Sequence, residues 1–474
     1  MDIKYFPLYL LILLNFSYQA NSDNYIIIPL HYAYNDNSIN NYIEFLLQPQ
    51  LYGEIKFGNP EHSIYLLIST ESTYFSIESK YFNEKFYDFS KSSTFINTTK
   101  KVNFYNEIYK SSYICKDQFY FINDINTMKE EPYQNMSFYY VNEISNEYSQ
   151  KLEKYYINKN KNKPNGIIGL KLPDSFSSGN NILKYLNNIK AISKNIWSLY
   201  MMKSNLYLIF GKDLYKEQYN EVKRTTCYGS GYYNYWYFLF NDIMIGNNKS
   251  NDERAAEYSP QIGVIIGVKE YQNYLKKYFF GSFIEKNICN EEKLNLNGII
   301  YNYYVCYKDI NLNNFESIEF IHEELSYKFI LDKNDLFMDY GNKKLFLCIF
   351  IEYEKGYSSY STNHWILGLP FVKKYNFVFD EDSKNILFYD KKSIYDNYFN
   401  RDSGVIYWII VIILFLFAGV LFIYLIIKII YKPKQIKANE LEESFSYKIN
   451  ENLKNKDILD SIYIYNSKYN NLGI

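Results

Sequence analysis

Residues 51–60 read Leu-Tyr-Gly-Glu-Ile-Lys-Phe-Gly-Asn-Pro, residues 64–68 form an apolar run, and residues 69–72 read Ser-Thr-Glu-Ser. Short strand-like runs recur along the chain between Gly, Asn, Asp and Pro turn residues; they include 65–68, 207–210, 235–240 and 377–379. This pattern is typical of a mostly β domain. Helices are predicted only at 181–191 and 270–280, where apolar residues recur at helical spacing.

The composition argues against two broad classes of protein. Lys and Arg number 51 against 52 Asp and Glu, so the net charge is -1 and no strong field attracts nucleic acid. The 56 Tyr and 35 Phe supply more aromatic surface than a disordered chain carries. We therefore expect a folded protein, either roughly three domains or one large two-lobed unit with additions, and no nucleic-acid partner.

Two apolar segments predict the compartment and the topology. Residues 1–22 combine Lys4, an apolar run and small residues at the end, which is typical of a cleaved signal peptide. Residues 405–427 carry no charge and are long enough to span about 30 Å of hydrocarbon as a helix. Lysines follow directly, so the positive-inside rule puts the tail at 428–474 in the cytosol. The sequence predicts a type I membrane protein of the secretory pathway or cell surface, with a stalk at 396–404 and the N-terminal part lumenal or extracellular.

The predicted lumenal part contains all five cysteines, Cys115, Cys227, Cys289, Cys306 and Cys348. Disulfides persist in such an oxidising compartment, but an odd number leaves at least one thiol without a partner in the chain, and spacing alone fixes no pairing. Sequons begin at Asn97, Asn135 and Asn248 and predict N-linked glycans on the same side of the membrane.

Signatures of several enzyme classes are absent from the sequence. The four histidines, His31, His62, His322 and His364, are scattered and lack the spacing of a zinc site. No Gly-rich loop leads into the Lys-Ser/Thr pair of nucleotide-binding proteins, and no Gly-x-Ser-x-Gly elbow is present. The sequence therefore predicts neither a metal nor a cofactor.

Six further short blocks follow residues 51–60 in a fixed order. They are Ser-Ser-Thr-Phe at 92–95, Asn-Gly-Ile-Ile-Gly-Leu at 165–170, Leu-Tyr-Leu-Ile-Phe-Gly at 206–211, Tyr-Trp at 235–236, Trp-Ile-Leu-Gly at 365–368 and Val-Phe-Asp at 378–380. This order resembles the pepsin-like aspartic peptidase family, the family of the plasmepsins, over residues 45–391. There the first block reads Tyr-x-Gly-x-Ile-x-Ile-Gly-x-Pro, a middle one Asp-Gly-Ile-Leu-Gly-Leu, and the last Trp-Ile-Leu-Gly with Val-Phe-Asp.

The resemblance implies a mostly β, bilobal pepsin-like acid protease fold, here followed by the transmembrane helix. Its N-terminal lobe would span 45–215 and its C-terminal lobe 216–395, after a linker at 23–44. In the family each lobe donates one Asp from an Asp-Thr/Ser-Gly loop, and the two carboxylates, about 3 Å apart, share a proton. Ser69 occupies the first of these positions, and anchoring on the helix that follows the second loop assigns the other to Ser259. Because neither hydroxyl can replace a carboxylate, we predict a pseudoenzyme.

The same resemblance assigns further residues of the cleft. Thr70 and Ser72 belong to the first loop, and Glu71 stands where the family has a glycine. Tyr105 matches the tyrosine of the family's flap, the hairpin that closes over the substrate, although the glycines of the flap turn are missing. An ordinary strand aromatic is an equally good interpretation of that tyrosine in a chain with 56 Tyr.

A disulfide is also implied by the resemblance. Cys306 and Cys348 fall where the family carries a disulfide in its second lobe, so this pair is predicted. It would stabilise the fold by about 3 to 4 kcal/mol in the chain-entropy model. The resemblance assigns no partner to Cys115, Cys227 or Cys289.

Three functions are compatible with these residues. A pseudoprotease would keep the cleft and bind a peptide or protein there. The absence of both catalytic aspartates favours this interpretation. A divergent active endopeptidase would use Glu71 as a substitute carboxylate, although the sequence offers no second carboxylate in the other loop to pair with it. A structural or adhesive ectodomain would use its outer surface, for which the sequence offers only its aromatic richness. We favour the first.

Overall fold

The computed structural model describes residues 24–32, 42–48, 51–78, 88–103, 109–144, 164–173, 181–202, 204–218, 223–227, 235–250, 253–296, 298–353, 364–389 and 441–444. The chain divides into two compact units, Met1–Ile394 and Tyr395–Ile474, and the described strands all belong to the first. The predicted signal peptide, membrane span and flap residue Tyr105 lie outside the described residues. Among the helices that are described, none has the length and apolar character needed to cross a membrane.

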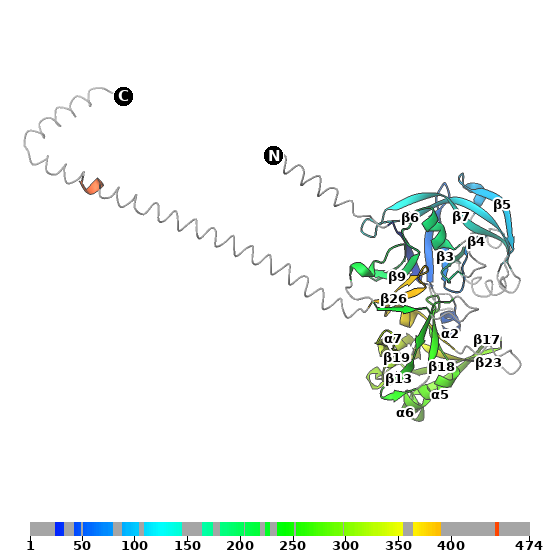
Figure 1. The fold of residues 1–474 in the computed structure, drawn as a ribbon. Helices are drawn as coiled ribbons and strands as arrows, with labels where there is room; N and C mark the ends of the chain where they lie inside the picture. The colour runs from blue at the N-terminus through cyan, green and yellow to red at the C-terminus, as the bar shows by residue number, and fades with distance from the viewer. Residues whose placement is uncertain are drawn as a thin grey trace, which may run out of the picture. The chain divides into compact units, whose positions relative to one another are not determined.

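The prediction of a mostly β fold is confirmed, because the strands that the structure describes form three sheets. Figure 1 shows these strands as arrows. The 13-stranded sheet follows the order β11 (Lys223–Thr226), β26 (Asn385–Tyr389), β25 (Asn376–Asp380), β9 (Ile196–Met202), β10 (Asn205–Phe210), β1 (Ile26–Tyr32), β2 (Leu51–Phe57), β3 (His62–Ser69), β8 (Gly166–Gly169), β4 (Phe75–Glu78), β7 (Glu130–Ile144), β6 (Tyr109–Ile122) and β5 (Ile96–Asn103). The 9-stranded sheet contains β12 (Tyr237–Phe240), β15 (Arg254–Tyr258), β24 (Trp365–Leu367), β16 (Ile265–Gly267), β23 (Cys348–Tyr353), β18 (Ile299–Tyr307), β22 (Lys343–Phe346) and β21 (Phe337–Tyr340), with β17 (Cys289–Leu296) beside β18. The 4-stranded sheet contains β14 (Asn248–Lys249), β13 (Asp242–Ile245), β19 (Ile318–His322) and β20 (Tyr327–Leu331).

The helices that the structure describes in the first unit are short and lie between strands in the sequence. They are α2 (Tyr42–Leu46), α4 (Ile182–Asn188), α5 (Lys269–Tyr278), α6 (Gly281–Glu285), α7 (Lys333–Leu336) and α8 (Leu369–Val372), with 3-10 turns η3 (Phe89–Lys91), η4 (Tyr215–Glu217) and η5 (Leu312–Asn314). The predicted helices near 181–191 and 270–280 correspond to α4 and α5, so both predictions are confirmed. The side chain of Asn181 begins α4 by accepting hydrogen bonds from the backbone N–H groups of Leu183 and Lys184.

One arrangement of strands occurs twice. We call residues 51–173 the first half and residues 235–372 the second half. In the first half β3 runs parallel to β8, β8 is antiparallel to β4, and β4 is parallel to β7. In the second half β15 is parallel to β24, β24 is antiparallel to β16, and β16 is parallel to β23. The ends of β3 and β15 therefore have equivalent neighbours.

The central strands of each half bury both of their faces. Side chains alternate along a strand, so one face carries Ile68 in the first half and Tyr258 in the second, and both belong to one apolar core. The opposite face carries Leu67 in a separate apolar cluster of the first half and Ile366 in a separate cluster of the second. We call this second face the site face. Ser69 lies two residues beyond Leu67 and, because side chains alternate, on the same side of the strand.

Ser259 is assigned to the site face of the second half by the same alternation. Glu257 lies between core residues Ala256 and Tyr258, so its side chain points away from the core. It pairs in register with Ile366 of β24, which belongs to the site-face cluster. Ser259 follows Glu257 by two residues, so the alternation puts its side chain on the site face as well.

The expectation that residues 23–44 form a linker is wrong for most of the part that the structure describes. Ile26, Ile27 and Ile28 are buried on strand β1, which pairs with β10 and with β2. Three consecutive β-branched residues favour a strand that is buried on both faces, and that physical preference explains the strand. Helix α2 also begins inside the expected linker, at Tyr42.

Candidate functional site

The loop after β3 and the loop after β15 are joined by hydrogen bonds. We call residues 69–72 the first loop and residues 258–261 the second loop. Thr70 is fully buried, and its Oγ1 donates to the backbone oxygen of Tyr258 at 3.0 Å and faces Gln261 Oε1 at 3.1 Å. The buried hydroxyl thus satisfies a backbone carbonyl of the opposite loop, which holds the two strand ends together.

Close backbone approach at the first loop, and just beyond the second loop, requires glycine. A Cβ on Gly169, at the end of β8, would lie 2.4 Å from the backbone oxygen of Ser72. A Cβ on Gly368, just after β24, would lie 2.0 Å from the backbone oxygen of Val264. These glycines lie at the ends of the two sequence blocks at 165–170 and 365–368, so the blocks supply the close contacts beside the loops.

The structure brings the two predicted serine positions to matching strand ends. Ser69 is 7% exposed, and its Oγ accepts a hydrogen bond from the backbone N–H of Glu71 at 3.2 Å. Ser259 is 1% exposed, and its Oγ has no hydrogen-bond partner within the described part of the chain. Ser72 Oγ accepts from the backbone N–H of Tyr74 at 3.1 Å, which shapes the first loop. Neither of these two positions, 69 or 259, carries a carboxylate.

Glu71 is the carboxylate that the first loop itself carries. Its Oε1 accepts a hydrogen bond from Gln261 Nε2 at 3.0 Å, so the carboxylate contacts the second loop through an amide. The side chain remains exposed, although protein surrounds the carboxyl group on most sides. This desolvation, together with the charge of Glu257, raises the pKa of Glu71 above its ordinary value, while the Gln261 hydrogen bond and the charge of Lys171 oppose the increase.

Sequence reasoning missed a second group of polar residues on the site face. Glu257 is buried, and His364 Nε2 lies 3.5 Å from its Oε2. The ring of His364 meets the ring of Tyr237 edge-on, with 5.3 Å between the ring centres. Glu257 could have been found by its position two residues before Ser259, because alternation puts both on one side of the strand. His364 gives no such signal, since it lies far away in the sequence.

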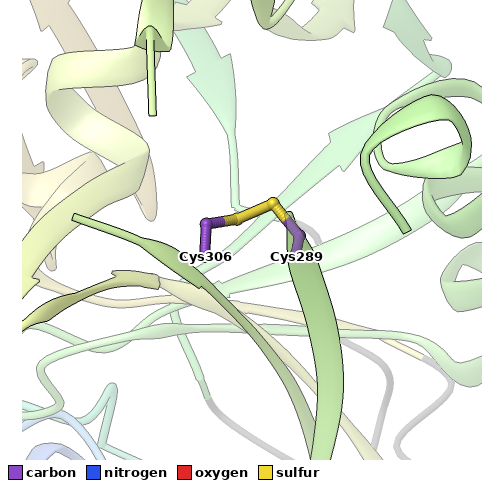
Figure 2. Close-up of a disulfide and its surroundings, with 2 residues drawn as sticks. All are labelled: Cys289 and Cys306. Carbon is purple, nitrogen blue, oxygen red and sulfur yellow. A yellow bond between two sulfur atoms is a disulfide. The ribbon is translucent and has the colours of Figure 1, made fainter. Parts of the chain in front are cut away.

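The predicted Cys306–Cys348 disulfide is wrong. Cys306 is bonded to Cys289, and Figure 2 shows the pair. The hairpin of β17 and β18 puts Cys289 directly opposite Cys306. Cys348 instead begins β23, where it pairs in register with Ile265 of β16, and its buried thiol is free. The other two cysteines, Cys115 and Cys227, are free as well.

The remaining predicted sites fall on the surface or outside the described residues. Asn97, Asn135 and Asn248 are all exposed, which is compatible with glycan attachment. Within the described ranges, no group of three or more His, Cys, Asp or Glu side chains is arranged to hold a metal ion. A search for similar proteins found no matching protein family and no matching curated protein.

Proposed function

We propose that the chain is a membrane-anchored, pepsin-like protein that does not hydrolyse peptides and that binds an extended peptide or protein segment at the two joined loops. The observation that carries this proposal is the hydrogen bond from Thr70 to Tyr258, which joins matching strand ends that present Ser69 and Ser259. The repeated strand arrangement and the ordered sequence blocks support the pepsin-like part. The apolar segment at 405–427 supports the membrane anchor.

The chemistry of the strand ends argues against hydrolysis by a shared-proton pair. Two neighbouring carboxylates hold one proton between them, so one acts as a base while the other acts as an acid. A serine hydroxyl performs neither role without a basic partner. Among the described residues, the Ser69 hydroxyl accepts a hydrogen bond only from a backbone N–H, and the Ser259 hydroxyl has no partner.

The site face supports binding of an extended segment. Strand-end loops offer backbone groups to a peptide, while side chains on the adjoining face select alternate residues of that peptide. In the first half the buried site-face cluster is accompanied by the partly exposed rings of Tyr65 and Tyr74. Aromatic rings bury a large area at a low cost in conformational entropy, so we expect them to favour peptides with apolar or aromatic side chains.

The test uses the full chain in detergent, incubated with a peptide library from about pH 4 to pH 7. Mass spectrometry measures cleavage, and pull-down measures retained peptides. We expect retention without cleavage. Cleavage by the unmodified chain contradicts the loss of catalysis, and the absence of any retained peptide contradicts binding at this site and favours use of an outer surface.

Divergent endopeptidase activity is the second candidate, because one observation favours it. Glu71 of the first loop accepts a hydrogen bond from Gln261 of the second loop at 3.0 Å, which puts a carboxylate where the two loops meet, and the charge of Glu257 contributes to raising its pKa. If the chain cleaves peptides through Glu71, Glu71→Gln abolishes the cleavage. The matched control Glu61→Gln, at an exposed position in the turn between β2 and β3, leaves it unchanged. Cleavage that survives Glu71→Gln excludes this candidate.

A further inference from the structure

Helix α2 is bound to the second half next to the second loop. The backbone N–H of Gly263 donates to the backbone oxygen of Leu46 at 2.8 Å. Gly263 lies shortly after Ser259, and the backbone N–H of Ile262 between them points to the Ser259 oxygen at 3.4 Å. A backbone donor immediately beside the second loop is therefore occupied by residues that precede β2 in the sequence.

Apolar side chains complete this contact. Ile43, Phe45 and Leu46 are buried, and they belong to one cluster with site-face residues of the second half. The residues they join include Ile262, Val264, Ile266 and Ile366. The ring of Tyr42 lies 5.3 Å from the ring of Tyr340, centre to centre, which extends the contact to β21.

The contact covers the face that adjoins Ser259. Ile366 belongs to the covered cluster, and it pairs in register with Glu257. In the first half, the equivalent cluster around Leu67 and Ile167 contains no residue from α2. The two halves thus differ in one respect: within the described residues, α2 contributes to the site-face cluster of the second half and not to that of the first half, which is buried by its own strands.

We propose that residues 42–48 are a built-in occupant of the site face of the second half. An external segment binds there by displacing them, and it has the same chemistry: apolar side chains in the pattern Ile-x-Phe-Leu, and a backbone carbonyl for the N–H of Gly263. The inference rests on the proposed function and specifies the class of segment that the second half accepts. Because the occupant and the ligand compete, the affinity for the ligand is reduced by the fraction of chains in which the face is free.

The first experiment weakens the occupant. The probe is a labelled synthetic peptide with the sequence of residues 40–50, added to the full chain and to the variant Phe45→Ala/Leu46→Ala. We expect the variant to bind the probe roughly tenfold more tightly than the unmodified chain. The control Met201→Ala truncates an exposed apolar side chain on β9, and it should bind the probe like the unmodified chain. Equal affinities for the variant and the unmodified chain overturn the inference.

The second experiment needs no variant, and so it also serves if the double substitution fails to fold. Hydrogen exchange is measured over residues 42–48 of the unmodified chain, with and without a saturating library peptide. The backbone N–H groups of Leu47 and Gln48 are hydrogen-bonded to Ile43 and Phe45, so displacement should accelerate their exchange. Unchanged or slower exchange with the peptide bound overturns the inference while leaving peptide binding established. If no library peptide binds and the probe binds the variant no better than the unmodified chain, the proposed function and this inference fail together.

Discussion

The first loop and the second loop follow the same arrangement of strands but differ in the side chains that they carry. The first loop carries a carboxylate, Glu71, whereas the second carries the buried amide of Gln261. The hydroxyl of Ser69 accepts a backbone hydrogen bond, and that of Ser259 has no partner within the described residues. What the two loops share is backbone geometry, which depends on Thr70 and on the glycines behind each loop. The same arrangement of strands therefore supports different side chains at its two ends.

The halves also differ in their cysteines, and breaking the disulfide should have the largest effect. Cys306 on β18 is bonded to Cys289, whereas Cys115 on β6, in the first half, is a free buried thiol. Closing a loop with a sequence separation of 17 stabilises by about 3 kcal/mol in the chain-entropy model. We expect Cys289→Ala/Cys306→Ala to lower the free energy of unfolding by about that amount, measured by denaturant titration.

Two further observations sharpen the comparison of cysteines. Cys115→Ala removes only the packing of one small buried side chain, so it should cost about 1 kcal/mol. Proteolysis without reduction, followed by mass spectrometry, should yield one linked pair of peptides, containing Cys289 and Cys306. Recovery of a peptide pair linked through Cys348 would contradict the pairing.

Glu381 tests the region where the last strands join the large sheet. It is buried in the turn between β25 and β26, and its Oε1 accepts from Asn181 Nδ2, at the start of α4, at 3.0 Å. Burial raises the pKa of Glu381 from 4.5 to about 8. The charges of Asp382 and Asp380 also raise this pKa, while the Asn181 hydrogen bond and the charge of Lys184 lower it. The folded chain therefore holds this proton more tightly than the unfolded chain, and stability falls as pH rises from about 4.5 to 8.

A glutamine at this position should remove that pH dependence. Glu381→Gln keeps the acceptor for Asn181 but cannot ionise. From pH 5 to pH 8 the unmodified chain should therefore lose about 2 to 3 kcal/mol more of its free energy of unfolding than the variant does. Denaturant titrations at the two pH values measure the change. Glu61→Gln, at its exposed turn, is the matched control. An unchanged pH slope in Glu381→Gln would show that Glu381 ionises normally.

Local sequence predicted the first loop, because strand, loop and neighbouring strand lie within residues 51–72. Ser259 was reached by anchoring on the helix that follows it, and α5 does begin at Lys269. The disulfide was missed because its pairing depends on the register of β17, whose sequence is mostly polar and carries little strand signal. Helix α2 was missed because five residues are too few to show helical periodicity, and its stability comes from packing on the second half.

Removing the hydroxyl that joins the loops tests what they share. Thr70→Val keeps the shape of the side chain but leaves the buried carbonyl of Tyr258 without this donor. The expected loss in the free energy of unfolding is about 1 to 3 kcal/mol. Thr70→Ser keeps the hydroxyl and should lose less, so the two variants separate the hydrogen bond from packing. Equal losses in a denaturant titration would mean that the hydroxyl contributes nothing beyond its volume.

The smallest effects on stability are expected at the sequons, which are exposed in both halves. Asn248→Gln should change the free energy of unfolding by no more than about 0.5 kcal/mol, as is usual for surface positions. Asn135→Gln should cost more, because Asn135 has a φ of 57°, a conformation that asparagine tolerates better than glutamine. Both should remove one glycan each, seen as a mass shift after endoglycosidase treatment of the chain from eukaryotic cells. Glycans in both halves would show that both halves lie on the lumenal side of the membrane. A chain without glycans would contradict the predicted topology.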